Sequence, residues 1–289
     1  MTPGEHRSHP PKAESTRLEF LTGQALKKIR ERQRIREISR PGDARCKRCH
    51  QGFSPSWDHL EGRWKYPGMA EDGICRRCKR LIHIREYIEQ YLVKAGVPPK
   101  YMKCSFENFK VTGENRQSFG LCKGYVSGPD YTLFIYGNYG VGKTHMAVAI
   151  TRELLLQGRQ VAFTSVPRLL FEIRKSFRAG SEVTEEYYIS RYTSYEYLVL
   201  DDFGVEKTTE WARQTLDYII YERDNNLKPM VITSNLSLDE IAEKIDGRIS
   251  SRLAGMGKVI QLKGSDYRLR RVKPGTRPKG GESERSEDK

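Results

Sequence analysis

Apolar residues recur along this chain in two different patterns, and the change between them falls near residue 100. From Tyr101 onward, short apolar runs alternate with longer segments whose apolar residues have helical spacing. The runs predict strands at YTLFIYG, QVAFTSV, YEYLVLDDFG and KPMVITSNL, and the longer segments predict helices at KTHMAVAITRELLLQG, PRLLFEIRKSFRAG and TEWARQTLDYIIYERDNN. Strands and helices that alternate in this way form a parallel sheet covered on both faces. The sequence therefore predicts an α/β fold for this part of the chain.

The part before residue 100 has a less regular pattern. Residues 18–39 place apolar side chains at helical spacing opposite a strongly basic face, which predicts an amphipathic helix that is either structural or bound to a partner. The dipeptide Pro98-Pro99 would end a further helical segment and mark a hinge. Both ends of the chain are rich in Pro, Ser and charge and are expected to be disordered. We expect a tail over 1–17, a helical adaptor domain over 18–98, an α/β domain over 99–272 and a tail over 273–289.

The charge of the chain suggests a class of partner. Its 289 residues carry a formal net charge of +14, and Lys and Arg bind polyanions such as nucleic acid because they release the counterions condensed on phosphates. A basic surface that only keeps the protein in solution would carry the same charge. No apolar stretch approaches the roughly 18 residues that would span a bilayer, and the N-terminus lacks the apolar region of a signal peptide. We therefore expect a cytoplasmic protein without a membrane partner.

A glycine-rich motif follows the first predicted strand. The octapeptide GNYGVGKT matches the phosphate-binding pattern GxxxxGK[ST], and it lies between a predicted strand and a predicted helix, as that pattern requires. Backbone N–H groups of such a loop, with the dipole of the following helix, bind nucleotide phosphates. Lys143 would reach the β- and γ-phosphates, and the Thr144 hydroxyl would ligate Mg²⁺. The loop residues are Gly137, Asn138, Tyr139, Gly140, Val141 and Gly142.

Polar residues at the ends of two later strands could complete this site. Asp201 follows the apolar run YLVL and would be the second Mg²⁺ ligand, while Asp202 could orient and deprotonate the attacking water or merely cap the next turn. Asn235 ends the strand VITSN, where its amide could reach the γ-phosphate or the water, although Ser-Asn is also ordinary turn chemistry. Arg248 and Arg252 lie one helical turn apart, and either could stabilise phosphate charge or be an ordinary surface residue.

Four cysteines before residue 80 form two close pairs. Cys46 and Cys49, and then Cys75 and Cys78, give the pattern C-x2-C-x25-C-x2-C, which is typical of a closed tetrahedral zinc site. The linker is longer than usual, so that one ligand could instead be a histidine, either His50, His59 or His83. The same four cysteines could also be redox-active thiols or simply buried side chains.

The remaining cysteines, Cys104 and Cys122, have no paired neighbour and are expected in the core. Basic residues surround the four paired cysteines and could form a surface for DNA, or the same region could dock a protein. These residues are Lys47, Arg48, Arg76, Arg77, Lys79 and Arg80. The sequence does not separate the two roles.

Taken together, the motifs resemble those of the AAA+ ATPases of the DnaC/DnaI helicase-loader family and of the related IstB transposition ATPases. The resemblance extends from about Phe106 to Arg271. It rests on FENF, GNYGVGKTH, VPRLLFEIRKSF, YLVLDDFG, ITSNL, RISSRL and GSDYRLRR, of which the first and third have no general role in phosphate binding. The resemblance implies a AAA+ fold for the α/β domain and ATP with Mg²⁺ as its ligands.

The resemblance also implies a role for each matching position. Asp201 matches the Mg²⁺-coordinating Walker B acid, and Asp202 matches the catalytic acid. Asn235 matches sensor 1, Arg252 the arginine finger given to the adjoining subunit, and Arg268 the sensor 2 position. Related enzymes usually carry Asp-Glu where this chain has Asp-Asp. A slow ATPase, in which ATP is a timed switch, is therefore expected.

The resemblance also implies that the segment LLFEIRKSFRAG contacts single-stranded DNA. The chemistry suits that role, because Arg and Lys neutralise phosphates and aromatic rings stack on bases. The candidate residues are Phe171, Arg174, Lys175, Phe177 and Arg178. Phe171 or Phe177 could equally belong to the core.

The sequence thus predicts an ATP-dependent loader that self-associates on ATP, binds a hexameric replicative helicase through its zinc-binding adaptor domain, and delivers the helicase to single-stranded DNA. A second hypothesis is an IstB-like regulator that assembles on duplex DNA and directs a transposase. A third is a DNA-binding adaptor that does not hydrolyse ATP and uses it as a structural ligand.

Overall fold

The computed structural model of the protein describes residue 27 and residues 40–58, 63–177, 183–204 and 209–270. Their contacts divide the chain into two compact units, Met1–Arg80 and Leu81–Lys289. The amphipathic helix predicted over 18–39 lies outside the described residues except for Lys27, as do both predicted tails. In the described part of the chain, no helix has the length and apolar character needed to cross a membrane.

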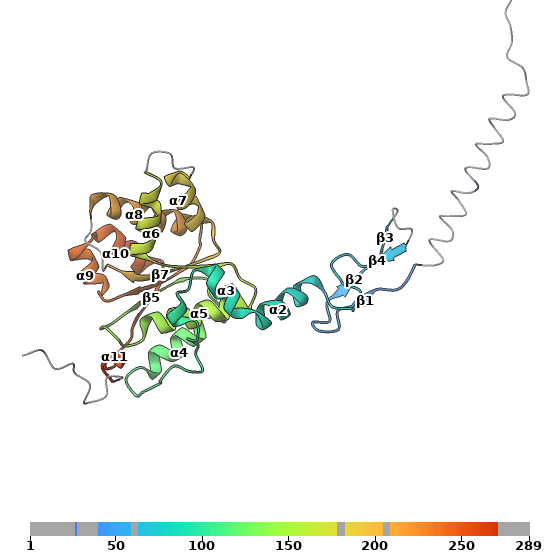
Figure 1. The fold of residues 1–289 in the computed structure, drawn as a ribbon, viewed down its shortest axis with the longest axis horizontal. Helices are drawn as coiled ribbons and strands as arrows, with labels where there is room; N and C mark the ends of the chain where they lie inside the picture. Colours follow the sequence, from blue (N-terminus) through green and yellow to red (C-terminus); the bar gives the residue numbers. More distant parts are fainter. Residues whose placement is uncertain (1–26, 28–39, 59–62, 178–182, 205–208, 271–289) are drawn as a thin grey trace, which may run out of the picture. The chain divides into compact units, whose positions relative to one another are not determined.

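Over residues 40–80, the described part of the first unit consists of two short antiparallel strand pairs and the beginning of a helix (Figure 1). Strand β1 (Ala44–Arg45) pairs antiparallel with β2 (Gly52–Phe53), and β3 (Ser56–Asp58) pairs antiparallel with β4 (Arg63–Lys65). Helix α2 (Arg76–Glu86) starts directly after Cys75 and crosses the boundary between the units. Because the unit has few apolar residues, its core is small: the buried cysteines pack against Phe53 and Ile74.

The second unit is built on a five-stranded parallel sheet, which confirms the predicted α/β fold. The strand order is β6-β7-β8-β5-β9, with all neighbours parallel. The strands are β5 (Thr132–Tyr136), β6 (Val161–Ser165), β7 (Tyr197–Phe203), β8 (Met230–Ser234) and β9 (Gly257–Gln261). The sequence analysis did not predict β9, because this edge strand buries only Ile260 fully and lacks a continuous apolar run.

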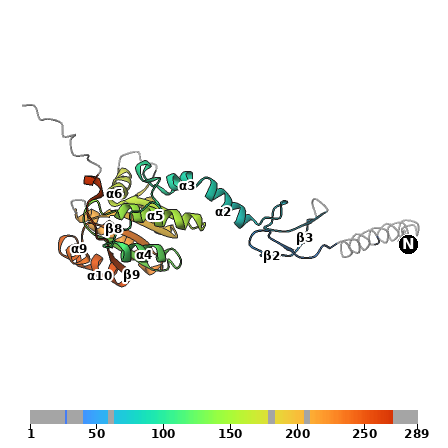
Figure 2. The ribbon, with the colours of Figure 1, turned by 90° about the horizontal axis from the view of Figure 1, so that it is seen from below.

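Helices cover both faces of this sheet (Figures 1 and 2). One face packs against α3 (Ile88–Ala95), α4 (Arg116–Tyr125) and α5 (Lys143–Leu156). The other face packs against α6 (Val166–Lys175), α7 (Glu185–Ser194), α8 (Glu210–Asn225), α9 (Leu238–Lys244) and α10 (Gly247–Gly255). Two shorter helices are η1 (Pro99–Tyr101) and α11 (Tyr267–Arg270).

The side chains of the central strands alternate between these two layers. Leu133 and Ile135 of β5 belong to the core under α3, α4 and α5, whereas Phe134 belongs to the opposite core. This two-residue period is the geometry of an extended strand, and both cores are apolar because helices cover each face of the sheet. Since all five strands are parallel, their carboxyl ends lie at the same edge of the sheet.

Helix α3 packs with the second unit. Its buried Leu92 and the following Val97 join the core that contains α5. Pro99 begins η1 and donates no backbone hydrogen bond, in agreement with the end of the helix before it. Helix α3, which precedes the expected domain boundary at residue 98, therefore contributes its buried residues to the α/β core. The boundary itself stays a prediction.

Candidate functional site

The loop between β5 and α5 has a conformation that only glycine adopts easily. Gly137 and Gly142 have φ values of 155° and 101°. A Cβ atom on Gly137 would lie 2.2 Å from the carbonyl oxygen of Leu262, and one on Gly142 would lie 2.8 Å from the ring of Phe109. These contacts require glycine at both positions. The loop therefore passes close to other parts of the chain and ends at the first residue of α5, Lys143.

Lys143 is held inside this loop by three oxygen atoms. Its Nζ donates to the carbonyl oxygens of Gly137 at 2.7 Å and Asn138 at 2.8 Å, and to Oδ1 of Asn235 at 2.7 Å. Its side chain is nearly buried, with 7% exposed. Burial lowers the pKa of Lys143 to about 8, although the nearby Asp202 and Asp201 act in the opposite direction. The structure thus brings the expected phosphate-binding lysine into contact with the expected sensor residue.

Asp201 lies at the end of β7 between two hydroxyl groups. Thr144 Oγ1 donates toward both carboxylate oxygens at 3.0 Å, and Thr233 Oγ1 donates to Oδ1 at 2.5 Å. Burial raises the pKa of Asp201 to about 6, opposed by the hydrogen bonds from Thr233 and Thr144. A hydroxyl beside a carboxylate is the oxygen donor set that suits Mg²⁺. Thr144 and Asp201 therefore fit the role of magnesium ligands.

Asp202 has an unusual backbone conformation that turns it away from the strand. Its φ is 57°, in the left-handed region, and the pairing of β7 with β8 shifts register between Leu200 and Phe203. Its backbone N–H donates to Thr233 Oγ1 at 3.1 Å. The shift leaves Asp202 exposed while Asp201 and Phe203 are both buried. Strain of this kind is held in place by the surrounding structure and is common at functional sites.

Thr233 was missed by the sequence analysis although it contacts both acidic residues. It is fully buried in β8, where its single hydroxyl donates to Asp201 and accepts from the backbone of Asp202. The sequence could have indicated Thr233 as a polar residue inside the apolar run MVITS of a central strand. A buried hydroxyl in such a strand needs partners, and the neighbouring strand supplies them.

Part of this group faces a cavity of about 1000 Å³, whose lining does not include the buried Asp201 and Thr233. Its lining includes the glycine-rich loop, Lys143, Thr144, Asp202 and Asn235. Its size lies at the upper end of the range of small-molecule sites. The expected sensor residue Arg268 also lines it, near the start of the short helix α11.

Residues between 99 and 115 form a second wall of the cavity. The sequence analysis gave this segment no part in the site: Pro99 was expected at a hinge, Cys104 in the core, and FENF counted only toward the family resemblance. This wall includes Tyr101, Phe109 and Asn115. Phe109 stacks on Phe119 with ring centroids 5.6 Å apart and meets His145 edge to face at 5.2 Å. The wall therefore adds aromatic surface beside the phosphate-binding loop, where the Phe109 ring lies close to Gly142. This surface suits a ligand with a flat ring as well as phosphates.

Arg252 lies elsewhere, on α10, and does not line this cavity. Its guanidinium forms an ion pair with Asp217 of α8 and lies over the ring of Tyr221, 5.1 Å from the centroid. The side chain is 23% exposed. Arg252 therefore cannot act on a nucleotide in its own cavity without a rearrangement, and its partly exposed position suits a contact with another subunit.

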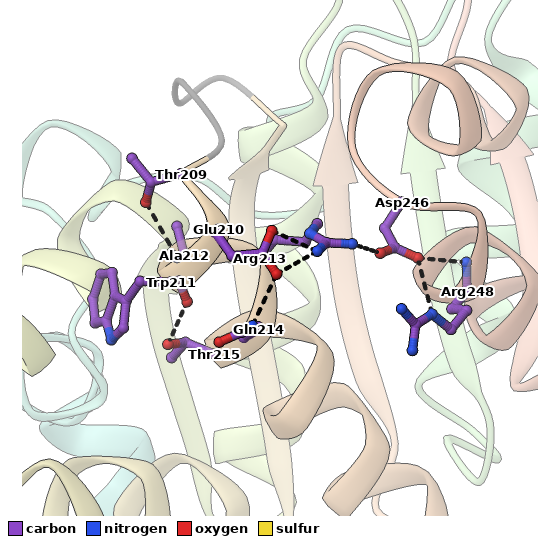
Figure 3. Close-up of polar contacts among 9 residues, drawn as sticks. All are labelled: Thr209, Glu210, Trp211, Ala212, Arg213, Gln214, Thr215, Asp246 and Arg248. Carbon is purple, nitrogen blue, oxygen red and sulfur yellow. Dashed lines mark hydrogen bonds and ion pairs between the residues drawn. The ribbon is translucent and has the colours of Figure 1, made fainter.

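A second ion pair ties α10 to α8 (Figure 3). Asp246 caps the start of α10 by accepting from the backbone N–H of Arg248 at 2.7 Å, and it also pairs with Arg213 of α8. Arg213 pairs in addition with Glu210 at 2.5 Å. Two arginine–carboxylate contacts thus hold α10 against α8. Arg248 itself is largely exposed, with 78% of its side chain accessible.

The residues expected to contact DNA lie on or just after α6 and are largely exposed. Phe171 and Phe177 are 55% and 56% exposed, so neither ring belongs to the core. Lys175 lies over the Phe171 ring at 4.8 Å, and Arg174 lies over the ring of Trp211 at 4.7 Å. Arg178 lies outside the described residues.

Trp211, at the start of α8, extends this aromatic and basic surface. Its ring meets Phe177 edge to face at 5.6 Å, and its indole N–H donates to Glu185 at 3.2 Å. The sequence analysis missed it because 34 positions separate it from Phe177 and only the packing of α8 beside α6 brings them together. The sequence could have indicated Trp211 as a large aromatic residue among the mostly polar residues that begin this helix.

The four paired cysteines converge in the first unit. Their Sγ atoms all lie within 4.8 Å of one another, and those of Cys49 and Cys75 are 3.7 Å apart. Sulfur atoms on a tetrahedral zinc ion with Zn–S bonds of about 2.3 Å lie about 3.8 Å apart. Backbone N–H groups of Cys75 and Cys78 also donate to Sγ atoms of the group. The arrangement fits a structural zinc ion.

A histidine ligand finds no support in the described part of the chain. No described histidine joins the cysteine group. His83 instead contacts the hydroxyl of Tyr91 at 3.1 Å, and His59 lies outside the described residues. Of the unpaired cysteines, Cys122 is fully buried in the core and Cys104 packs against it half-buried.

Comparisons with known proteins agree with this geometry. The family model of the IstB-like ATP binding protein matches residues 125–274. The chain is 28% identical to the replicative helicase loader DnaC of Escherichia coli (strain K12) over 164 residues, which span 55% of this chain and 66% of that protein. It is 25% identical to DnaC of Buchnera aphidicola subsp. Baizongia pistaciae over 202 residues, which span 68% and 78% of the two chains.

A solved structure supports the fold. The crystal structure of the DnaC helicase loader superimposes with a TM-score of 0.52 at 24% sequence identity, and the match covers 57% of this chain and 100% of that one. The match spans 66%, just under two thirds, of the E. coli relative. The family model begins at residue 125, after the four paired cysteines.

Proposed function

The chain belongs to the family of IstB-like ATP-binding proteins, and on this premise we propose that it is a DnaC-like AAA+ ATPase that binds a replicative helicase and delivers it to single-stranded DNA. The observation that carries the ATPase part is the meeting of Lys143, Asn235, Thr144 and Asp201 at one edge of the sheet. The helicase part is supported by relatives that are named replicative helicase loaders.

In the proposed ATP site, each residue has one task. Lys143 exchanges its three oxygen partners for phosphate oxygens, which are the stronger acceptors. Thr144 and Asp201 hold Mg²⁺, which when bound neutralises developing charge on the phosphates. Asp202 orients the attacking water and accepts its proton, and Asn235 positions the γ-phosphate or the water. Arg268 approaches the phosphates from the α11 side of the cavity.

The active form is proposed to be an assembly. Arg252 lies outside its own cavity and partly exposed on α10, so it can serve only a nucleotide held by a neighbouring subunit. An arginine supplied in this way stabilises charge in the transition state. ATP binding and self-association are then linked, because each nucleotide contacts two subunits. With Asp202 in place of the usual glutamate, turnover is slow and ATP acts as an assembly and release switch.

Single-stranded DNA is proposed to bind across α6 and the start of α8. The exposed Phe171 and Phe177 offer rings for base stacking, and Arg174 and Lys175 offer charge for phosphates. Trp211 joins them through its contacts with Phe177 and Arg174. The four cysteines are proposed to hold a structural zinc ion that maintains the fold of the first unit.

The test combines the full-length chain, the host's replicative helicase and a single-stranded DNA circle. With ATP, we expect the helicase to co-elute with the circle in gel filtration, and we expect Lys143→Ala to abolish this transfer. Helicase that reaches the circle equally well without the chain, or never associates with it, would contradict the proposal.

A second candidate function follows from the name of the matching family. An IstB-like transposition regulator would assemble on duplex DNA and direct a transposase. ATP-dependent filaments on duplex DNA, observed by electron microscopy in a protein with no affinity for helicase, would favour that function.

A further inference from the structure

The basic charge of the chain is concentrated before the ATP-binding unit. Residues 40–80 contain ten Lys and Arg against five Asp and Glu, whereas residues 81–270 contain 26 against 23. A zinc ion held by four thiolates would contribute a formal charge of about −2, which still leaves residues 40–80 basic. With zinc bound, residues 40–80 would carry about +3, the same net charge as residues 81–270. In the first region this charge is spread over far fewer residues, so the cysteine unit has the higher density of positive charge to attract polyanions.

Helix α2 places three arginines away from the cysteine group. Successive helical residues are rotated by about 100°, so that Arg76 and Arg80 lie roughly 160° around the axis from Cys78, whose thiol joins the group. Arg77 lies roughly 100° from Cys78 by the same geometry. All three arginines are exposed. They form a basic face, here called the α2 arginine face, on the part of the helix surface that is turned away from Cys78.

The described residues offer these arginines no acidic partner. Arg76, Arg77 and Arg80 form no ion pair within that part of the chain, while the nearby Lys79 pairs with Asp72 at 2.9 Å. Arg76 and Arg80 are neighbours at i and i+4, and the first turn of α2 contains no acidic residue. Like charges at this spacing repel each other, and cations are unfavourable near the start of a helix. Such an arrangement weakens the isolated helix and is relieved by a bound anion.

The described surface of residues 40–80 lacks the apolar anchors of a typical protein interface. No large hydrophobic side chain is exposed among the described residues of 40–80. Protein interfaces gain most of their affinity from buried aromatic and aliphatic anchors. A surface that offers guanidinium groups and no such anchor fits phosphates instead, because the planar fork of arginine binds phosphate oxygens in pairs.

We propose that the α2 arginine face binds the phosphate backbone of nucleic acid, as a contact separate from the aromatic surface of α6. The contact goes beyond the proposed loading function: it gives the cysteine unit a partner that neither the family match nor the named relatives assign. Because backbone phosphates carry no sequence information, the contact supplies affinity and positioning without sequence preference.

The test measures binding of the full-length, zinc-loaded chain to a fluorescent oligo(dT) and, separately, to a fluorescent duplex. Anisotropy is recorded between about 50 and about 200 mM salt, and log K is plotted against log salt. In Arg76→Ala/Arg80→Ala, loss of two phosphate contacts should make the slope shallower by about 1.4 on the single strand or about 1.8 on the duplex. The probe whose slope changes identifies the form of nucleic acid that the face contacts.

Three further variants control the result. Arg116→Ala/Lys123→Ala removes the same charge from exposed positions of α4 and should leave the slope unchanged. Arg76→Lys/Arg80→Lys keeps the charge and should retain the slope of the wild type. Phe171→Ala/Arg174→Ala should weaken stacking and remove at most one phosphate contact. Zinc content and thermal unfolding of each variant verify that the cysteine unit remains folded.

Specific outcomes would overturn the proposal. The proposal fails if Arg76→Ala/Arg80→Ala keeps the affinity and the salt slope of the wild type. It also fails if the α4 control loses as much affinity and slope as this variant, because only net charge would then matter. Loss of helicase binding with intact DNA binding would assign the face to an acidic protein surface. Failure of the α6 variant to weaken DNA binding would instead count against the DNA site in the proposed function and leave the arginine face standing.

Discussion

The hydroxyl of Thr233 holds both acidic residues of the ATP site, and its removal is the most direct test of that site. Thr233→Val keeps the size and branching of the side chain in a fully buried position. It removes the donor to Asp201 Oδ1 at 2.5 Å and the acceptor for the backbone N–H of Asp202 at 3.1 Å. The variant therefore separates hydrogen bonding from packing.

The size of the effect follows from the charge of Asp201. A hydrogen bond to a charged group contributes about 1.5–3 kcal/mol. The pKa of Asp201 is already raised to about 6 by burial, and Thr233 opposes that rise. Loss of this donor favours the protonated form, which cannot ligate Mg²⁺ well. Since about 1.4 kcal/mol corresponds to one pH unit, the acid limb of Mg²⁺-dependent ATP binding should move up by about one to two pH units.

The assay is ATP binding by fluorescence, measured from acid to alkaline pH at fixed Mg²⁺. Thr233→Ser keeps the hydroxyl and should retain the profile of the wild type, which makes it the matched control. Thermal unfolding verifies that both variants fold, because the unpaired N–H of Asp202 alone is expected to cost about 1–3 kcal/mol. A Thr233→Val protein with the wild-type pH profile and Mg²⁺ dependence would refute the role assigned to Thr233.

Four further changes test the remaining parts of the site. Asp201→Asn should weaken Mg²⁺-dependent ATP binding but raise the free energy of unfolding at pH 7 by up to about 3 kcal/mol. The reason is that the pKa of Asp201 is about 6 in the folded protein against the ordinary 3.8, so that the carboxylate lowers stability as pH rises through this window. Equal stabilities of the two proteins at pH 7 in denaturant unfolding would contradict this. Lys143→Ala should lose nucleotide affinity in calorimetry, and full retention would exclude the loop as the site. Arg252→Ala should lower phosphate release at unchanged ATP binding, and mixing it with Asp202→Asn should restore part of the activity if the arginine serves a neighbour. Cys75→Ser should release zinc and expose residues 40–80 to protease while the ATP-binding unit stays intact; an unchanged digestion pattern would argue against a structural metal.

The sequence was most informative where chemistry is local or where topology forces residues together. The glycine-rich loop could be predicted because its glycines, lysine and threonine are consecutive. Asp201 and Asn235 could be placed near it because parallel strands end at one edge of the sheet. The contact of Lys143 with Asn235 at 2.7 Å and of Thr144 with Asp201 at 3.0 Å follows from that topology.

Features that depend on register or on packing between distant segments were not accessible in the same way. Thr233 lies beside Asp201 because β7 and β8 are neighbouring strands, and the register shift after Leu200 accompanies its second contact, with the backbone of Asp202. The cavity wall over 99–115 carries no phosphate-binding motif, and only the folding of the chain brings it to the cavity that the loop also lines. Arg248 and Arg252 are equivalent by spacing. Their different exposures, and the pairing of Arg252 with Asp217, appear only when α8 and α10 are packed together.

Helix α8 connects the surfaces that the proposed function requires. Its first turn carries Trp211, which contacts Phe177 of the expected DNA surface. Asp217 and Tyr221, further along the same helix, contact the arginine expected to serve the neighbouring subunit. The helix follows β7 in the chain, and β7 carries both acidic residues of the ATP site near its carboxyl end. Trp211 and the partners of Arg252 are carried by one helix, so that a displacement of α8 would change the aromatic surface and the position of Arg252 together. A DNA strand held by Trp211 and a nucleotide in the adjoining subunit would therefore act on the same element, which gives a physical route by which DNA binding alters ATP turnover.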